Sequence, residues 1–296
     1  MDIFMPNSWP KERAQYMLKI SVIMGVYNTC NADMLNCSIN SILTQTESNF
    51  EFIICDDGST DGTYELLTEI CKKDNRIILL RNKANMGLAA TLNCCIDVAG
   101  GEYIAKQDAD DYSVSDRIEK QVCFLEGHEE YAFVGSNIAL FDDHGQWGEY
   151  RLKEFPEKKD FLFTLPIMHS SVMYRKQALA SSGKYRVAEE TRRAEDYDLF
   201  MRMYTKGFRA ANIQECLLFY REDKESYKRR KYRYRIDEAK VRYKGYKQLG
   251  LMPNGYIYVL KPLIVGLIPN KLLNYLKDRN YKRRSINEKT MRDKHE

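Results

Sequence analysis

The sequence lacks the segments that mark an exported or membrane-spanning chain. Residues 1–19, MDIFMPNSWPKERAQYMLK, carry proline and mixed charge but no apolar core of the kind that a signal peptide contains. A later apolar stretch, YIYVLKPLI and the residues after it, runs for about a dozen residues and is interrupted by Lys261 and Pro262, so it is too short and too broken to cross a bilayer. We therefore expect a cytoplasmic protein.

The eight cysteines lack a pattern. Their spacing fits neither a zinc site nor a disulfide framework, and several lie inside apolar runs such as FIIC. We expect reduced cysteines in a protein core. No recognised nucleic-acid-binding module or aromatic platform accompanies the basic residues either, so nucleic acid is not an expected partner.

The chain as a whole also lacks a strong excess of one charge, but residues 1–219 and residues 220–296 have net charges of opposite sign. The net charge is +4, whereas residues 220–296 alone carry 22 basic and 9 acidic side chains. Residues 1–219 carry 24 basic and 33 acidic side chains. An acidic part followed by a basic tail suggests two different roles along the chain.

What the sequence does contain is an alternation of short apolar runs with helical patterns. The runs are rich in β-branched residues and have the length of strands that are buried on both faces. Strand and helix in turn predict an α/β fold with a mostly parallel central sheet and right-handed crossovers. The five predicted strands span residues 19–28, 50–57, 76–82, 102–108 and 131–136.

Acidic and aromatic residues follow three of these predicted strands. The stretch AKQDADDYSV places three aspartates within four positions, which opposes folding unless a cation or a proton separates the charges. Such a stretch is either a solvated turn or part of a metal site. Ligands of parallel sheets bind at the carboxyl ends of the strands, so Tyr27, Asp57, Asp108 and Asp110 are expected to converge on one crevice.

Six stretches of the sequence together resemble the family 2 inverting glycosyltransferases, whose nucleotide-sugar domain has the Rossmann-like GT-A fold. The resemblance covers about residues 19–220 and extends, through YREDKESYKRR and YIYVLKPLI, to members of bacterial biofilm exopolysaccharide synthesis. It implies a lead-in over 1–18, a catalytic domain over 19–220 and a basic helical tail over 221–296. The six stretches are SVIMGVYN, SILTQTESNFEFIICDDGSTDGT, NMGLAATLN, GEYIAKQDADD, DRIEKQVCFL and AEDYDLFMRM.

The resemblance implies a donor site. Asp110 would bind a divalent cation, Mn²⁺ or Mg²⁺, together with the donor diphosphate, and Asp108 would face the cation or the ribose. Asp57 would accept a hydrogen bond from the base and Tyr27 would stack on it, which favours a pyrimidine donor such as a UDP-sugar. The base and diphosphate side is also lined, by the same resemblance, by Lys83 and Asn85.

The resemblance likewise implies an acceptor side. Asp196 would be the catalytic base that takes the proton of the acceptor hydroxyl, and direct displacement would invert the anomeric carbon. Glu195 would orient the acceptor or support the structure. His169 is either a neighbour of the diphosphate or acceptor or a structural residue, and Arg193 lies in a loop that could close on diphosphate or on an anionic acceptor.

The tail leaves several alternatives open. Tyr232, Ile236, Ala239, Tyr243 and Tyr246 have helical spacing, so the tail either packs on the catalytic domain or holds the enzyme on the anionic inner leaflet. The expected acceptor is a saccharide, free or lipid-linked, and other exopolysaccharide-synthesis proteins are possible partners. A regulatory protein on a glycosyltransferase scaffold is the main alternative. A sugar nucleotidyltransferase is disfavoured because GVYNTCN has one glycine and no basic residue.

Overall fold

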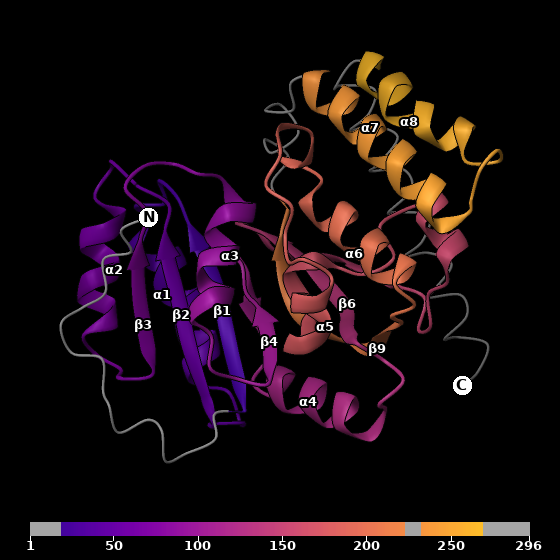
Figure 1. Ribbon diagram of the computed structural model, residues 1–296. Helices are drawn as coiled ribbons and strands as arrows, with labels where there is room; N and C mark the ends of the chain where they lie inside the picture. The colour runs from indigo at the N-terminus through magenta and orange to yellow at the C-terminus, as the bar shows by residue number, and fades with distance from the viewer. Residues whose placement is uncertain (1–18, 223–231, 269–296) are drawn as a thin grey trace.

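A computed structural model describes residues 19–222 and 232–268 of the chain. Its first part alternates strands with helices, as the sequence predicts (Figure 1). The elements are β1 (Ile20–Val26), α1 (Ala32–Leu43), β2 (Phe50–Asp56), α2 (Thr63–Cys71), β3 (Ile77–Arg81), α3 (Leu88–Val98) and β4 (Tyr103–Lys106).

These first four strands form a parallel sheet in the order β3-β2-β1-β4. The register pairs Val26 with Asp56 across β1 and β2, and Ile23 with Lys106 across β1 and β4. The prediction of a parallel α/β sheet is therefore confirmed for this part of the chain. It also means that the three strand ends with acidic or aromatic residues lie at the same edge of the sheet.

The sheet continues with mixed strand directions, which the expectation of a mostly parallel sheet allows. β8 is antiparallel to both β4 and β6, while β9 is parallel to β6. β8 follows a short 3-10 helix instead of a crossover helix, so the chain can enter it from the opposite end. The elements of this part are β5 (Tyr112–Ser113), α4 (Arg117–Gly127), β6 (Phe133–Asp142), β7 (Gly145–Tyr150), η2 (Lys158–Leu162), η3 (His169–Ser171), β8 (Met173–Arg175), α5 (Lys176–Ser181), η4 (Glu189–Thr191), α6 (Glu195–Thr205) and β9 (Ala210–Arg221).

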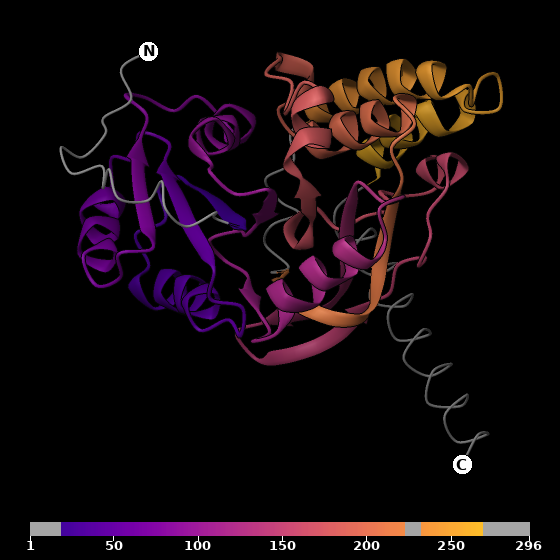
Figure 2. The ribbon, with the colours of Figure 1, turned by 60° about the horizontal axis from the view of Figure 1, so that its bottom comes forward.

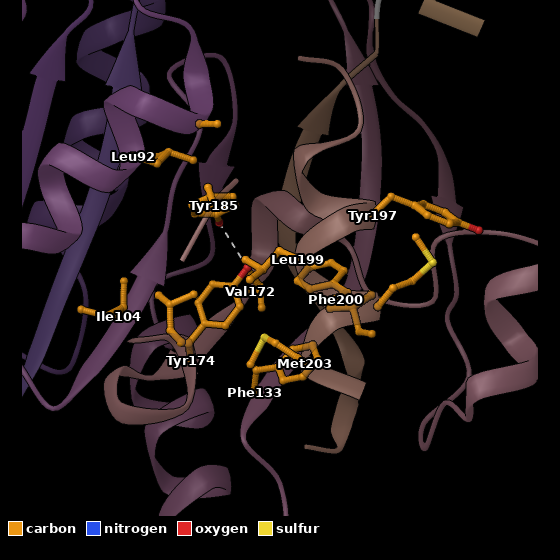
Figure 3. Packing of buried hydrophobic residues seen from close by; sticks show 14 of the residues in the cluster. Leu92, Ile104, Phe133, Val172, Tyr174, Tyr185, Tyr197, Leu199, Phe200 and Met203 are labelled. Atoms are coloured by element: carbon orange, nitrogen blue, oxygen red, sulfur yellow. Dashed lines mark hydrogen bonds between the residues drawn. The ribbon is translucent and has the colours of Figure 1, made fainter. Parts of the chain in front are cut away.

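Helices cover both faces of the sheet, with α3 opposite α1 and α2 (Figure 2). Neighbouring strand residues contribute to different cores: Ile53 packs in the cluster that contains α3, whereas Phe52 and Ile54 pack in the cluster with α1 and α2. This alternation follows from the two-residue period of a strand. The cluster on the α3 side continues through β8 into α6, as Figure 3 shows for Ile104, Tyr174 and Phe200.

The tail contains two helices, α7 (Tyr232–Leu249) and α8 (Tyr256–Leu267), which lie side by side at the outer end of the molecule (Figure 1). Of these, α7 packs against α6 and α8 packs against α7, so the helical nature of the tail is confirmed for the described residues. Residues 223–231 and 269–296 of the predicted tail lie outside the described residues. Among residues 19–222 and 232–268, no helix is both long and apolar enough to span a bilayer.

The predicted tyrosine seam of the tail is correct only in part. Ala239 and Tyr246 are buried, but Tyr232, Ile236 and Tyr243 are each more than 40% exposed. The buried face of α7 passes instead through Arg242, Gly245 and Leu249. The reason is close packing: a side chain at Gly245 would clash with Met201 of α6, so the two helices meet at a glycine.

Candidate active site

Tyr27, Asp57 and Asp108 each follow the last residue of a strand or lie within two residues of it, on the neighbouring strands β1, β2 and β4. Asp57 donates its backbone N–H to the carbonyl of Val26 at 2.8 Å, so the first two strand ends remain in register past the strands themselves. The structure therefore brings these three predicted site residues to one edge of the sheet.

The carboxylate of Asp57 holds a loop in place. It accepts hydrogen bonds from Asn82 Nδ2 at 2.8 Å and from the backbone N–H groups of Met86 and Gly87 at 2.9 and 2.8 Å. Gly58 makes this arrangement possible, because its φ is +70° and a Cβ there would approach the backbone of Ala84 to 2.6 Å. Asp57 is thus an organiser of the loop over residues 82–87, a role that the sequence did not predict.

The other predicted donor-side residues are accessible. Tyr27 is 45% exposed after β1. Lys83 and Asn85 are exposed on the loop that Asp57 holds. Their exposure leaves this side of the edge open to a ligand.

Asp108 forms an ion pair with a fully buried lysine. Lys106 Nζ lies 2.5 Å from Asp108 Oδ1, and the side chains of Lys106 and Asp108 are 0% and 26% exposed. Burial alone would raise the pKa of Asp108, but the charge of Lys106, together with His169 and the hydrogen bonds of Lys106 and Ser170, outweighs it, so the pKa is lowered. Asp108 is therefore ionised and fixed in direction.

The two following aspartates differ from each other. Asp110 reaches the surface, yet desolvation in the crevice, followed by repulsion from Asp108, raises its pKa to about 6. Asp111 is buried, accepts the backbone N–H of Arg221 at 2.9 Å, and leaves its Oδ2 without a partner among the described residues. Burial and the two neighbouring aspartates raise the pKa of Asp111 well above its usual range.

The acidic stretch suits a divalent cation that arrives with further ligands. No group of three or more histidine, cysteine or acidic side chains within residues 19–222 and 232–268 is arranged to enclose a metal ion. Asp108 and Asp110 nevertheless supply hard carboxylate oxygens, and Oδ2 of Asp111 is a buried oxygen without a partner among those residues. Mg²⁺ and similar ions commonly take one or two carboxylates and complete their shell with water and substrate phosphate.

His169 is a buried neighbour of this stretch. It is 8% exposed, and its Nε2 shares a hydrogen bond of 2.8 Å with the hydroxyl of Tyr185. That hydroxyl lies 3.2 Å from the hydroxyl of Tyr174, and Figure 3 shows both rings. Burial, followed by the charge of Lys106, lowers the pKa of His169 well below its usual range, so the imidazole is neutral. These contacts fix the orientation of the His169 ring against Tyr185.

Glu195 and Asp196 begin α6 and face different surroundings. Burial, followed by the charge of Asp196, raises the pKa of Glu195 to about 8, and its Oε2 has no partner among the described residues. Burial raises the pKa of Asp196 to about 6, and the backbone N–H of Tyr197 and the charge of Lys106 oppose the rise. At neutral pH Asp196 is therefore the ionised member of the pair and Glu195 the protonated one.

Arg193 points toward the tail. Its guanidinium lies 5.9 Å from the ring centre of Tyr234 in α7, and its side chain is exposed, as is that of Arg192. The predicted contact of Arg193 with a ligand would therefore take place where the loop before α6 meets α7.

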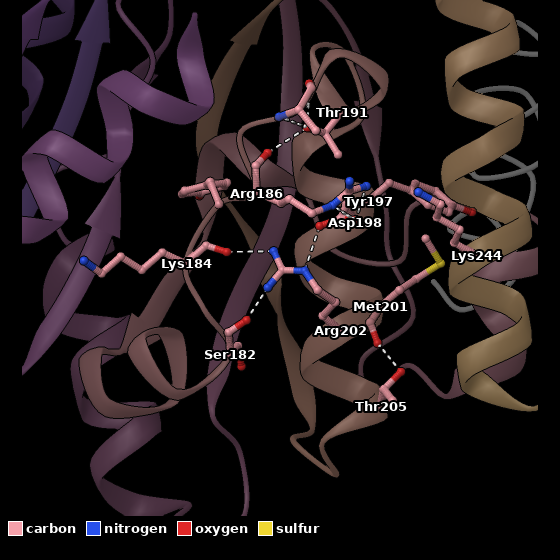
Figure 4. Close-up of polar contacts among 12 residues, drawn as sticks. Ser182, Lys184, Arg186, Thr191, Tyr197, Asp198, Met201, Arg202, Thr205 and Lys244 are labelled. Carbon is pink, nitrogen blue, oxygen red and sulfur yellow. Dashed lines mark hydrogen bonds and ion pairs between the residues drawn. The ribbon is translucent and has the colours of Figure 1, made fainter. Parts of the chain in front are cut away.

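The start of α6 is fixed by a network of arginines around Asp198 (Figure 4). Asp198 pairs with Arg186 Nη2 at 2.9 Å and with Arg202 Nε at 2.7 Å. Arg202 also donates to the carbonyls of Ser182 and Lys184. Because α6 is held on both sides, the position of Asp196 at its first turn is set by the fold.

Sequence reasoning missed two buried cations. Lys106 lies between the acidic stretch and α6, and it acts on the pKa of Asp108, His169 and Asp196. Arg117 is 0% exposed and donates to the backbone carbonyl of Lys106 at 2.5 Å. A lysine at the end of an otherwise apolar strand was a usable signal, because buried lysines need a charged partner.

The sequence is similar to several glycosyltransferases. Over 279 residues it is 43% identical to EpsE of Bacillus subtilis (strain 168), a match that spans 94% of this chain and 98% of that protein. It is 29% identical over 261 residues to the UDP-Glc:alpha-D-GlcNAc-diphosphoundecaprenol beta-1,3-glucosyltransferase WfaP of Escherichia coli, with 88% of this chain and 98% of WfaP covered. It is also 27% identical over 270 residues to the amylovoran biosynthesis glycosyltransferase AmsE of Erwinia amylovora, with 88% of this chain and 99% of AmsE covered. The expected resemblance to exopolysaccharide-synthesis members is thereby confirmed.

The fold is similar to those of solved glycosyltransferases. TarS 1-349 of S. aureus in complex with UDP-GlcNAc aligns with a TM-score of 0.63 at 18% identity, over 84% of this chain and 71% of that one. The mannosyltransferase PcManGT from Pyrobaculum calidifontis, in complex with GDP-Man and Mn²⁺, aligns with a TM-score of 0.57 at 18% identity, over 90% and 81%. The predicted GT-A fold is confirmed by these likenesses.

A family model described as glycosyl transferase family 2 matches residues 21–182. The match includes the strand ends with Tyr27, Asp57 and Asp108 and stops before Asp196. The relative EpsE extends the similarity over most of the chain, including α6. With the model matching more than half of its length, the chain belongs to glycosyl transferase family 2.

Proposed function

We propose that the protein is a metal-dependent inverting glycosyltransferase of exopolysaccharide synthesis. It moves a sugar from a nucleotide diphosphate donor to a saccharide or lipid-linked acceptor. The observation that carries the proposal is the electrostatic link between two acidic groups: Lys106, which is paired with Asp108, also acts on the ionisation of Asp196. One buried charge thus acts on both the proposed cation-binding motif and the candidate base.

The donor side is assigned to the edge of β1, β2 and β4. The loop that Asp57 organises would receive the nucleotide, with Tyr27 available to stack on the base and Lys83 and Asn85 on the open side of the loop. When bound at Asp108 and Asp110, Mn²⁺ or Mg²⁺ would stabilise the negative charge on the departing diphosphate.

The acceptor side is assigned to the start of α6. Asp196 takes the proton of an acceptor hydroxyl while that oxygen forms a bond to the anomeric carbon and the carbon–oxygen bond to the diphosphate breaks. A single displacement inverts the anomeric carbon and leaves no sugar on the enzyme. Glu195 is protonated at neutral pH and orients the acceptor or supports the first turn of α6.

A UDP-sugar is the proposed donor. Support comes from the relative WfaP, whose name gives UDP-Glc, and from TarS, which was solved with UDP-GlcNAc. PcManGT was solved with GDP-Man, so the fold itself accommodates a purine donor as well. The choice between bases depends on how the loop over residues 82–87 meets the ligand.

The proposed place of action is the inner face of the cell membrane, where a lipid-linked acceptor would be met. The support is an exposed apolar row on α8, in which Ile257, Leu260, Ile264 and Leu267 are each more than 50% exposed. The same row would also suit a protein partner, as the regulatory alternative requires. A lipid surface is favoured because residues 220–296 carry 22 basic against 9 acidic side chains, an excess that an anionic leaflet attracts.

The direct test is a screen of nucleotide sugars with and without Mn²⁺ or Mg²⁺. A ligand that binds only the native state at 100 times its Kd stabilises it by about 2.7 kcal/mol, which raises the melting temperature. We expect a UDP-sugar to do so only with the metal, and the product to have the inverted anomeric configuration by NMR. If no nucleotide sugar stabilises the protein, and the protein consumes none of them under any of these conditions, the proposal is wrong.

A further inference from the structure

Lys106 is an uncommon residue for the interior of a sheet. It ends β4, and the alternation along this strand turns its side chain to the same face as Ile104, the face that carries α3 and α6. The side chain is fully buried, and its ammonium group lies against Asp108. A buried ammonium group needs a compensating charge, and Asp108 provides it.

The backbone of Lys106 is held as firmly as its side chain. Its N–H donates to the carbonyl of Val172 at 2.9 Å, and its carbonyl accepts from Arg117 at 2.5 Å. Arg117 is itself buried and donates to Gln107 and Ser113. Lys106 therefore cannot move away from Asp108 by a rotation of an exposed side chain, because both ends of the residue are enclosed.

This pairing changes what a cation meets at the acidic stretch. One oxygen of Asp108 is already in contact with an ammonium group, and the charge of that carboxylate is balanced by it. Asp110 is the exposed carboxylate of the stretch, and Asp111 is buried against the backbone of Arg221. A lone divalent cation would thus gain little net negative charge and would lie close to a fixed positive one.

A donor diphosphate reverses this balance. Its oxygens add negative charge and further ligands on the open side of Asp108 and Asp110, which is what Mg²⁺ or Mn²⁺ takes from a substrate. We propose that Lys106 is a positioning residue that makes binding of the divalent cation conditional on the nucleotide diphosphate. The inference rests on the proposed function in assuming such a donor, and it assigns Lys106 a role in the order of binding.

The test measures free Mn²⁺ by electron paramagnetic resonance while the protein is titrated, with and without UDP. In the unmodified protein we expect Mn²⁺ to bind at least about tenfold more weakly without UDP than with it, which is a coupling of ordinary size. By reciprocity, the affinity for UDP should fall by the same factor when Mn²⁺ is absent. In Lys106→Met, whose side chain is apolar and of similar length, we expect Mn²⁺ alone to bind about tenfold more tightly than in the unmodified protein.

Two further variants separate the charge from other effects. Lys106→Arg retains the charge and should leave the affinity for Mn²⁺ alone weak. Lys120→Met removes a lysine that is paired on the surface with Asp116 and Glu215, and it should match the unmodified protein. If Lys106→Met is folded by circular dichroism and its affinity for Mn²⁺ alone is unchanged, the inference is overturned.

The inference stays testable if Lys106→Met does not fold. In that case the unmodified protein decides: binding of Mn²⁺ alone as tight as binding in the presence of UDP contradicts a conditional site. A failure of the proposed function looks different, because UDP would then not bind the unmodified protein with or without Mn²⁺. If UDP does not bind but Lys106→Met is folded, the Mn²⁺ titration of that variant still tests the role of Lys106.

Discussion

Asp196 and Glu195 illustrate how neighbouring carboxyl groups acquire different properties from the same helix terminus. Both are shielded from water, which raises both pKa values, but Glu195 also has Asp196 as a close negative neighbour. Environments that move two pKa values apart commonly separate the roles of acid and base. The ionised Asp196 is the group that can accept a proton at neutral pH.

The first prediction is a pH dependence. The pKa of Asp196 is raised to about 6, so the carboxyl is protonated below that pH and cannot act as the base. Turnover with saturating donor should therefore fall tenfold for each pH unit below about 6 and level off above it. A profile of kcat against pH measures this, and an acidic limb centred near pH 4 would contradict the assignment.

The second prediction concerns Asp196→Asn. The amide keeps the shape of the side chain but cannot take a proton, so turnover should fall by roughly a hundredfold or more. Donor binding, measured by the shift of the melting temperature with UDP and Mn²⁺, should be unchanged because Asp196 serves the acceptor. Equal losses of donor affinity and turnover would place the residue on the donor side instead.

The third prediction concerns Asp110→Ala. Removal of this exposed carboxylate should abolish metal-dependent binding of the nucleotide diphosphate. It should leave the fold intact and slightly raise the stability of the ligand-free protein, because it removes repulsion with Asp108. Calorimetric titration with UDP and Mn²⁺ provides the measurement. Undiminished metal-dependent binding would show that the cation lies elsewhere.

Single residues also show where sequence reasoning stops. The acidic strand ends could be located because apolar runs define the strands and parallel strands end at one edge. The contacts of Asp57 with Met86 and Gly87 could not be predicted, because they depend on how a loop 29 residues later folds back. Lys106 and Asp108 are only two positions apart, so their ion pair was predictable from the sequence, but the prediction considered the aspartates without the lysine.

Among the secondary-structure elements, the strands β1 to β4 and the beginning of β6 were predictable, whereas β5, β7 and β8 were not. β1 to β4 are apolar runs separated by helices, and their parallel direction follows from this alternation. β7 has six largely exposed residues, and β5 and β8 have only two and three, so their patterns carry little information. Their places in the sheet are decided by contacts with β6 and β9.

The fourth prediction concerns α8. If its exposed row lies on a membrane, the protein should sediment with vesicles that contain anionic phosphatidylglycerol and be released by salt, because the electrostatic part is screened within a Debye length. The double variant Ile257→Glu with Ile264→Glu should abolish sedimentation. It replaces two exposed apolar side chains, which would enter the lipid, with carboxylates that stay in water. Both residues are exposed, so the fold should be retained.

A matched control is Val187→Glu, which changes a residue of similar size that is 60% exposed outside the tail. It should sediment like the unmodified protein. If the double variant on α8 also sediments normally, the apolar row does not contact lipid. Loss of sedimentation in all variants would instead indicate a general effect of added negative charge.

The tail and the catalytic part form one unit in the described residues. Arg242 of α7 lies 4.8 Å over the ring of Tyr197, and the hydroxyls of Tyr246 and Tyr197 are 3.3 Å apart. Tyr246 also donates to the carbonyl of Phe161 at 2.9 Å. α7 therefore covers the residue directly after Asp196, and it contributes core residues to the cluster that contains α6.

The fifth prediction follows from this contact. A protein that ends at residue 222 should melt at a lower temperature and lose turnover even with a water-soluble acceptor, because α6 would lose the cover of α7. The variant Tyr246→Ala should be destabilised by about 3 kcal/mol or more, as for other large buried aromatic residues. Chemical denaturation measures the stability of the shortened protein and of the variant, and an assay with the water-soluble acceptor measures turnover. A shortened protein with normal stability and turnover would show that the tail only mediates attachment.

The contact between α6 and α7 also sets the order in which the protein matures. During synthesis the parallel strands β1 to β4 leave the ribosome first, and the N-terminal part of a chain generally folds first. Asp196 follows much later, and Tyr197 beside it remains uncovered until Arg242 and Tyr246 have been made. The nascent chain can thus assemble the proposed donor edge well before the proposed base, Asp196, has its final surroundings. Transferase activity should appear only after Tyr246 has been synthesised.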